Sequence, residues 1–198
     1  MSAIIQNIIP KQNFEIIGEA IGAIIALEVS NQETLQNLAK KANVYSERID
    51  PFNDEEQLMI NTMYDGSVYS SYTEKNTQGP NRYYIDVYAT GKASDKDGGL
   101  NSATLLKKYL GMCRYILQSH LYATLGFPPG FIMGTYVEEI QITDPQANQD
   151  AANTTSGRIT ISVRAIEDQE MWLGENLNSA ITGVKLSETE KGYKYEIQ

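Results

Sequence analysis

Residues 82–90 read Arg82-Tyr-Tyr-Ile-Asp-Val-Tyr-Ala-Thr90, and residues 158–165 read Arg158-Ile-Thr-Ile-Ser-Val-Arg-Ala165. Both stretches alternate between two sets of side chains, as a strand does when one face is buried and the other faces water. The inward set is Tyr83, Ile85, Val87, Ala89, Ile159, Ile161, Val163 and Ala165. The outward set is Tyr84, Asp86, Tyr88, Thr90, Arg158, Thr160, Ser162 and Arg164. We predict two half-buried strands with a large polar outer face.

A helical repeat of apolar residues lies between these two strands. Its members recur at the i, i+3, i+4, i+7 spacing of one helix face: Leu106, Tyr109, Leu110, Cys113, Ile116, Leu117, His120 and Leu121. The repeat predicts a long amphipathic helix from about Asn101 to Tyr122. It must end before Phe127-Pro-Pro-Gly130, because prolines cannot continue a helix.

A second helix is predicted near the N-terminus, where Ile17, Ile21, Ile24 and Ile25 form one apolar stripe and Asn13 is the expected N-cap. Gly18 and Gly22 interrupt this helix, and each weakens it by up to ~1 kcal/mol relative to alanine. Close packing against a neighbour and simple tolerance would both account for the two glycines, and we favour tolerance.

Shorter strands are expected at 44–49, 58–64 and 135–143, and a hairpin at 184–187 and 193–197. Polar loops are expected at 65–81, 91–99 and 144–157. The predicted fold is α+β: a mainly antiparallel or mixed β-sheet packed against an N-terminal helix and a long central helix, with a C-terminal hairpin. We expect a single domain over 1–198, in which 168–198 is a C-terminal extension that would form an appended hairpin.

Composition limits the classes of function. The chain has 198 residues, a net charge of −9 and a pI near 4.7, so broad binding to nucleic acid or to an anionic membrane is disfavoured. The apolar run from Ile16 to Val29 is too short to span a membrane and contains two glutamates. One cysteine excludes an internal disulfide framework, and Cys113 is expected to be a buried hydrophobe.

No residue cluster in the sequence indicates catalysis, a metal or a cofactor. The single histidine, His120, is expected to lie in the core or to cap the helix rather than to act in a triad. Asp95-Lys-Asp97-Gly-Gly99 lacks the further ligands of a calcium loop. Glu138 and Glu139 should point to opposite faces of a strand, so they should not form an acid/base pair. Two distant carboxylates could still meet in the fold as in a glycosidase.

Tyrosine is the most unusual part of the composition, with 13 residues against four phenylalanines. Tyrosine combines apolar area with a polar hydroxyl, which suits protein–protein or carbohydrate contacts, although ordinary sheet packing would also use it. The residues that we predict to form an interface are Tyr69, Tyr72, Tyr84, Tyr88, Lys92, Asp95, Lys96, Asp97, Arg158 and Arg164.

Over roughly residues 14–166 the order of these segments resembles the tail terminator and tail-completion proteins of tailed bacteriophages. The stretches that carry the resemblance are Asn81–Tyr88, Lys108–Leu117, Leu125-Gly-Phe127, Glu138–Ile142 and Arg158–Arg164. The family implies an α/β fold in a sixfold ring that caps the tail tube and joins it to the head, with no catalytic residues to carry over.

The resemblance further implies a virion protein made in the host cytoplasm, with the tail tube protein and head–tail connector proteins as partners. The acidic charge suits a ring whose lumen passes DNA without binding it specifically. Two alternatives stay open. One is another neck, tube or baseplate component, and the other is a carbohydrate-binding or hydrolytic accessory domain that uses the tyrosines and distant carboxylates.

Overall fold

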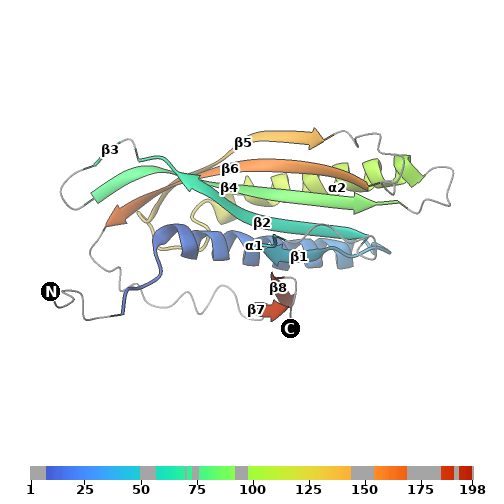
Figure 1. The fold of residues 1–198 in the computed structure, drawn as a ribbon, viewed down its shortest axis with the longest axis horizontal. Coiled ribbons are helices and arrows are strands. Elements are labelled where there is room, and N and C mark those ends of the chain that lie inside the picture. Colours follow the sequence, from blue (N-terminus) through green and yellow to red (C-terminus); the bar gives the residue numbers. More distant parts are fainter. Residues whose placement is uncertain are drawn as a thin grey trace.

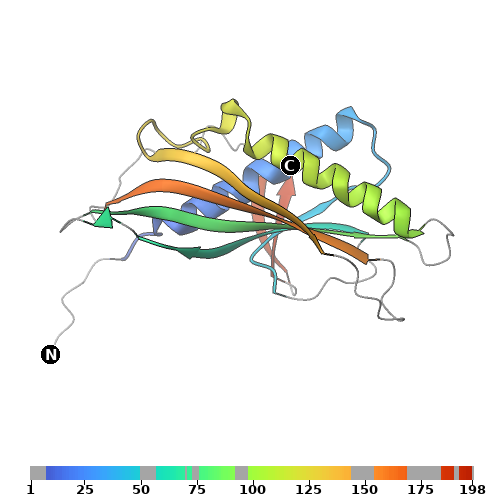
Figure 2. The same cartoon turned by 90° about the horizontal axis from the view of Figure 1, so that it is seen from above.

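A mixed β-sheet covered on one face by two helices forms the fold (Figures 1 and 2). The computed structural model describes residues 8–49, 57–69, 71–72, 76–91, 98–143, 154–168, 184–189 and 192–197. The helices are α1 (Asn13–Leu35) and α2 (Gly98–Leu117), followed by the short 3-10 helix η1 (His120–Tyr122). The strands are β1 (Asn43–Ser46), β2 (Leu58–Ser67), β3 (Ser71–Tyr72), β4 (Asn76–Thr90), β5 (Ile132–Thr143), β6 (Thr154–Asp168), β7 (Val184–Thr189) and β8 (Gly192–Ile197).

The strands are arranged in the order β5-β6-β4-β2-β1-β8-β7, and β3 pairs with β4 outside this path. The β1–β2 pair is parallel and the other pairs are antiparallel. The predicted α+β class is therefore confirmed, as a mixed sheet with two helices. No helix in the described part of the chain is long and apolar enough to cross a membrane.

The centre of the sheet is the long antiparallel pair of β4 and β6, in register from Asn76 opposite Asp168 to Thr90 opposite Thr154. All eight residues of the predicted inward set are buried, with exposures of 2% or less. The inward face was therefore interpreted correctly, because an apolar residue at every second position can face only one side of a strand. In the predicted outward set, however, Asp86, Thr90 and Ser162 are also buried, so this face is less open to water than predicted.

Two of the predicted loops are shorter than expected. β2 continues through a bulge between Tyr64 and Gly66 to Ser67, and β4 already begins at Asn76, so part of the expected loop 65–81 is strand. Similarly, β6 begins at Thr154, inside the expected loop 144–157. These polar residues extend the β4–β6 ladder, and the cross-strand hydrogen bonds outweigh their weak strand propensity.

The N-terminus of α1 differs from the prediction by one residue. Asn13 is the first helical residue, and Gln12 is the N-cap. The Glu15 carboxylate accepts a hydrogen bond from the Gln12 backbone N–H at 2.6 Å, while the Asn13 side chain donates to the Ile166 carbonyl at 3.0 Å. Asn13 therefore connects α1 to β6 instead of capping the helix.

Gly22 allows close packing, so our preference for simple tolerance was wrong at this position. A Cβ at Gly22 would lie 2.5 Å from ring carbons Cε2 and Cζ of Tyr195, closer than such atoms can approach. Tyr195 lies on β8, which pairs with β1, and its hydroxyl donates to the Glu19 carbonyl at 3.3 Å. The missing side chain thus lets the C-terminal part of the chain pack against α1.

The predicted helix 101–122 is divided in the structure. α2 ends at Leu117, and Ser119 then caps η1 by accepting a hydrogen bond from the Leu121 N–H. The apolar stripe is buried as far as Leu117, but His120 and Leu121 lie beyond the helix end and are exposed. His120 is therefore not a core residue. Cys113 is fully buried as expected, and burial raises the pKa of its thiol to about 12.

Candidate interaction surface

Both helices lie on one face of the sheet (Figure 2). The opposite, outer face carries a group of charged and aromatic side chains. Asp86 on β4 lies directly opposite Arg158 on β6. The Arg158 Nε atom donates to Asp86 Oδ1 at 2.6 Å, and its Nη2 atom donates to Oδ2 at 2.8 Å. This two-pronged geometry matches the planar fork of guanidinium to the carboxylate and fixes both side chains.

Tyr84 extends this group, because the Arg158 guanidinium carbon lies 4.0 Å from the centre of its ring. The hydrogen bond to Asp86 raises the pKa of Arg158, and burial raises the pKa of Tyr88. A hydrogen bond with Asp65 raises the pKa of Tyr84. Both tyrosines thus stay neutral and Arg158 stays charged near pH 7, so this part of the surface keeps a constant charge pattern.

Two further contacts connect the outer face across the strands to β5. Arg82 pairs with Glu138 at 3.1 Å, and the Arg164 guanidinium lies 5.9 Å from the centre of the Tyr136 ring. A shallow hollow of about 210 Å³ lies beside Asp86, Tyr88 and Arg158. Contacts of this kind on an exposed face, beside a hollow of only about 210 Å³, suit a contact surface better than a small-molecule site.

Glu138 and Glu139 share the outer face, which corrects the sequence prediction. A bulge lies between Val137 and Glu139, so the alternation of the strand shifts by one residue at this point. Glu138 pairs with the outward Arg82, and Glu139 lies opposite the outward Thr160. The Glu139 carboxylate accepts from the Gln141 amide at 2.8 Å. Among the residues that the structure describes, no group of three or more His, Cys, Asp or Glu could hold a metal ion.

The predicted interface residues fall into three groups. Tyr84, Tyr88 and Arg158 lie together on the outer face, and Arg164 lies further along β6. The Tyr69 backbone lies beside Gly79, whose partner on β6 is Ala165, so it belongs to the Arg164 end. Tyr72 lies in β3. The remaining four, Lys92, Asp95, Lys96 and Asp97, lie outside the described residues.

The sequence reasoning missed the apolar edge formed by β5. Ile140 and Ile142 lie opposite Ile159 and Gly157, on the face that the helices cover, yet they are 40% and 48% exposed. α2 packs mainly over β6 and β4, so it leaves these side chains partly uncovered. Within the described ranges, the far edge of β5 has no partner strand. The apolar alternation of 135–143 was visible in the sequence, but the position of α2 was not.

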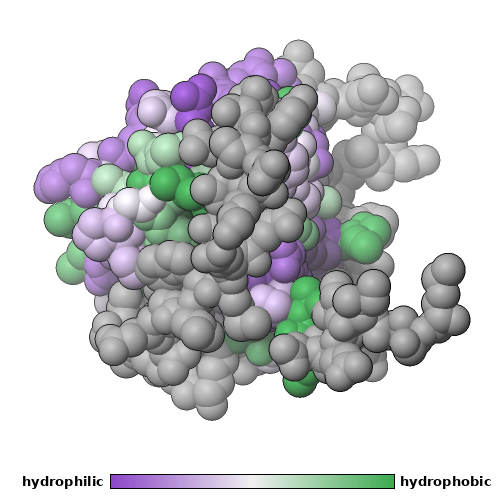
Figure 3. All heavy atoms as spheres, turned by 90° about the vertical axis from the view of Figure 1, so that its left-hand side faces the viewer, coloured by the Kyte–Doolittle hydropathy of each residue, from purple (hydrophilic) through white to green (hydrophobic). Residues whose placement is uncertain are grey.

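Figure 3 shows the hydropathy of the surface at the end of the molecule where β4 begins and β6 ends. Green apolar atoms form several small groups there among purple polar ones. Scattered apolar residues of this kind are normal on a protein surface.

Comparison with known proteins found similarity among solved structures. No protein-family model and no curated protein matches the chain. Among solved structures, the chain is similar to the sheath/tube terminator of PVC, an extracellular contractile injection system, in the extended state. The similarity has a TM-score of 0.31 and 10% sequence identity over 82% of this chain. The chain spans 60% of the length of that structure. A TM-score this low assigns neither a family nor a function.

Proposed function

We propose that this chain is a structural subunit of a phage or phage-like tail, similar to a tail terminator, that closes the tail tube as a ring and joins it to the head. The order of segments from 14 to 166 supports this proposal. The observation that carries it is the edge formed by β5, where exposed Ile140 and Ile142 adjoin an unpaired strand edge in the described part of the fold.

An unpaired edge strand offers a row of backbone donors and acceptors that a second chain can use. The opposite end of the sheet is β7, on which Leu186 is 42% exposed. Contact between β5 of one subunit and β7 of the next would join two different surfaces, and such head-to-tail contacts close into rings when the rotation permits. The proposed product is a hexameric ring.

The outer face and the charge of the chain fit the other partners in this proposal. The tail tube protein and the head–tail connector proteins would contact the fixed group around Asp86 and Arg158, together with the predicted interface residues. The net charge of −9 would let DNA pass the lumen without specific binding. We further propose one domain over 1–198, since β8 pairs with β1 and Tyr195 packs into the core. Its place would be in the virion after synthesis in the host cytoplasm.

Native mass spectrometry over a concentration series, with negative-stain images of the same samples, tests the ring. We expect a closed sixfold ring. Replacing both isoleucines, Ile140→Lys and Ile142→Lys, should abolish it and leave folded subunits, because both side chains are partly exposed. The matched control is Ile49→Lys, at a position that is 90% exposed and away from β5. Monomers at every concentration, or rings that survive the double substitution, would contradict the proposed interface.

Two alternative functions give different results. A ring with another symmetry would favour another neck, tube or baseplate component. Binding to a glycan array, or turnover of a polysaccharide by a protein that does not self-associate, would favour the carbohydrate-binding or hydrolytic domain.

A further inference from the structure

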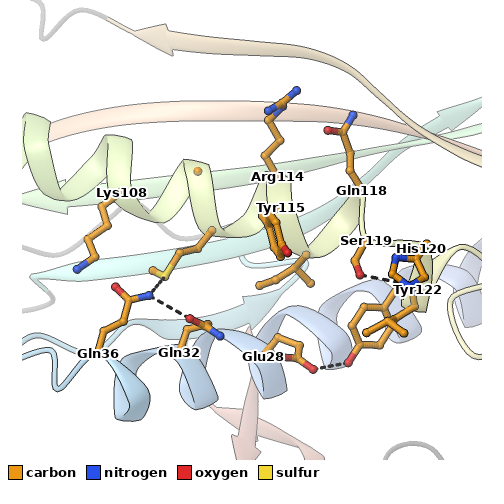
Figure 4. A pocket seen from close by; sticks show the side chains of 14 residues that line it. Glu28, Gln32, Gln36, Lys108, Arg114, Tyr115, Gln118, Ser119, His120 and Tyr122 are labelled. Carbon is orange, nitrogen blue, oxygen red and sulfur yellow. Dashed lines mark hydrogen bonds between the residues drawn. The ribbon is translucent and has the colours of Figure 1, made fainter.

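The outer surface of the helix layer holds the larger of the hollows described here, a groove of about 890 Å³ between α1 and α2 (Figure 4). Glu28, Gln32 and Gln36 form the α1 wall, and Lys108, Arg114 and Tyr115 belong to the α2 wall. Tyr115 is 80% exposed, and Leu121 at the end of the groove is 75% exposed. Two large apolar side chains thus lie uncovered on one polar-rimmed groove, the arrangement expected of a protein contact surface.

The two helices that form the groove carry opposite charges. α1 contains four glutamates and no lysine or arginine, whereas α2 contains Lys107, Lys108 and Arg114 and no acidic residue. In the part of the chain that the structure describes, no ion pair joins the two helices. Glu28 accepts a hydrogen bond from the Tyr122 hydroxyl instead, and Figure 4 shows the Arg114 side chain directed away from Glu28. Of the other α1 glutamates, Glu33 is buried and Glu19 pairs with Lys11, so Glu28 is the acidic residue that lines the groove. Glu28, together with the exposed Lys108 and Arg114, would meet a partner there.

Gly111 adds an independent observation in the middle of the α2 wall. It is exposed, and a Cβ built there would meet no atom within 4 Å. Glycine is less favourable than alanine inside a helix, and among the described residues nothing approaches Gly111 closely enough to require it. A helix from another molecule that packs directly on α2 would require such a notch.

We propose that this groove is a two-fold contact with a second copy of the chain, in which α1 of each copy lies on α2 of the other. A two-fold axis that runs along the groove, in the plane of contact, exchanges the α1 and α2 walls and keeps each residue at the same position along the groove. Each acidic helix then meets a basic one. This contact does not involve β5, and it does not rest on the proposed function.

The position of each side chain along the groove decides which charges meet in the dimer. Tyr122, just beyond α2, donates to Glu28, and the Gln36 side chain lies 3.8 Å from the Met112 sulfur. Glu28 is therefore level with the C-terminal end of α2, where Arg114 also lies. In the dimer, Arg114 of one copy meets Glu28 of the other, and Tyr115 enters the groove of the other copy. This ion pair forms twice because the contact is symmetric.

A charge-exchange experiment tests this contact by sedimentation equilibrium and native mass spectrometry. One variant makes α2 acidic (Lys108→Glu and Arg114→Glu), and the other makes α1 basic (Glu28→Lys and Gln32→Lys). Each variant alone should dimerise at least tenfold more weakly than the wild type, because like charges then face each other. A 1:1 mixture should form a heterodimer, since both contacts pair opposite charges again.

Two further variants distinguish a loss of the dimer contact from a loss of folding. Lys41→Glu reverses an exposed charge outside the groove and should leave dimerisation unchanged. Gly111→Leu should keep the monomer folded but weaken the dimer at least tenfold, because it fills the notch without changing charge. A wild-type protein that stays monomeric at roughly millimolar concentration, or a mixture of folded variants that does not pair, would overturn the proposal. The Ile140→Lys, Ile142→Lys variant tests the proposed function alone, because the dimer contact does not involve β5. This variant should lose the ring and keep the dimer.

Discussion

Replacing Gly22 with alanine would test how the C-terminal strand packs onto α1. The new Cβ would lie 2.5 Å from Cε2 and Cζ of the Tyr195 ring, and no atom pair of this kind tolerates that distance. Tyr195 is 7% exposed, and its hydroxyl donates to the Glu19 carbonyl. The ring therefore has to leave its position between α1 and β1, and its burial and its hydrogen bond are lost together.

The size of the effect follows from three contributions. Exposing a large side chain costs about 1.5–3 kcal/mol, and losing the hydrogen bond costs about 1 kcal/mol. Alanine is favoured over glycine within a helix by about 1 kcal/mol, which offsets part of the loss. We expect Gly22→Ala to lower the free energy of unfolding by about 2 kcal/mol, measured by urea denaturation. In a chain of this size the Tm should fall by roughly 6 °C.

A matched control and a double mutant define the result that would refute this reasoning. Gly111→Ala makes the same change where no atom lies within 4 Å, so it should stabilise the monomer by about 1 kcal/mol. In a Tyr195→Ala background, Gly22→Ala should likewise become stabilising by about 1 kcal/mol, because the clash is gone. If Gly22→Ala stabilised the wild-type protein as much as Gly111→Ala does, Tyr195 could not occupy the position described.

Three other predictions concern the outer face and the core. Arg158→Ala should lower the free energy of unfolding by about 2 kcal/mol, because the 6%-exposed Asp86 side chain loses both guanidinium donors. A loss under ~0.5 kcal/mol in urea denaturation would show that the pair contributes no more than an ordinary exposed ion pair. Burial raises the pKa of Tyr195 to about 12 from 10.0, so the folded state keeps the proton longer than the unfolded state. The protonated Tyr195 side chain therefore contributes fully to stability below pH 10, and this contribution is lost as the pH rises through 12. A Tm that did not fall across this range would contradict the raised pKa. Burial also raises the pKa of Cys113 to about 12, so Ellman's reagent at pH 8 should react with this thiol only at the rate of unfolding, and immediate labelling of the folded protein would show that it is accessible.

The candidate interaction surfaces were harder to predict from the sequence than the core was. Tyr84, Tyr88 and Arg158 were predicted as outward residues, and the structure places them together on one face. The bidentate contact with Asp86 depends on the register of β4 against β6, which no local pattern specifies. The exposure of Ile140 and Ile142 depends on where α2 lies over the sheet, so their alternation alone indicated only a strand.

The amino-acid sequence by itself determined which residues of β4 and β6 form the apolar core face, because side chains at every second position of a strand share a face. It also determined the apolar stripes of the two helix-forming segments, because a period of 3.6 residues selects one side of a helix. Only the tertiary structure decided that β4 starts at Asn76, that Glu138 and Glu139 share a face, and that Gly22 makes room for Tyr195. Each of these depends on atoms from segments far apart in the chain, and their packing and pairing energies exceed the local preferences that a sequence pattern records.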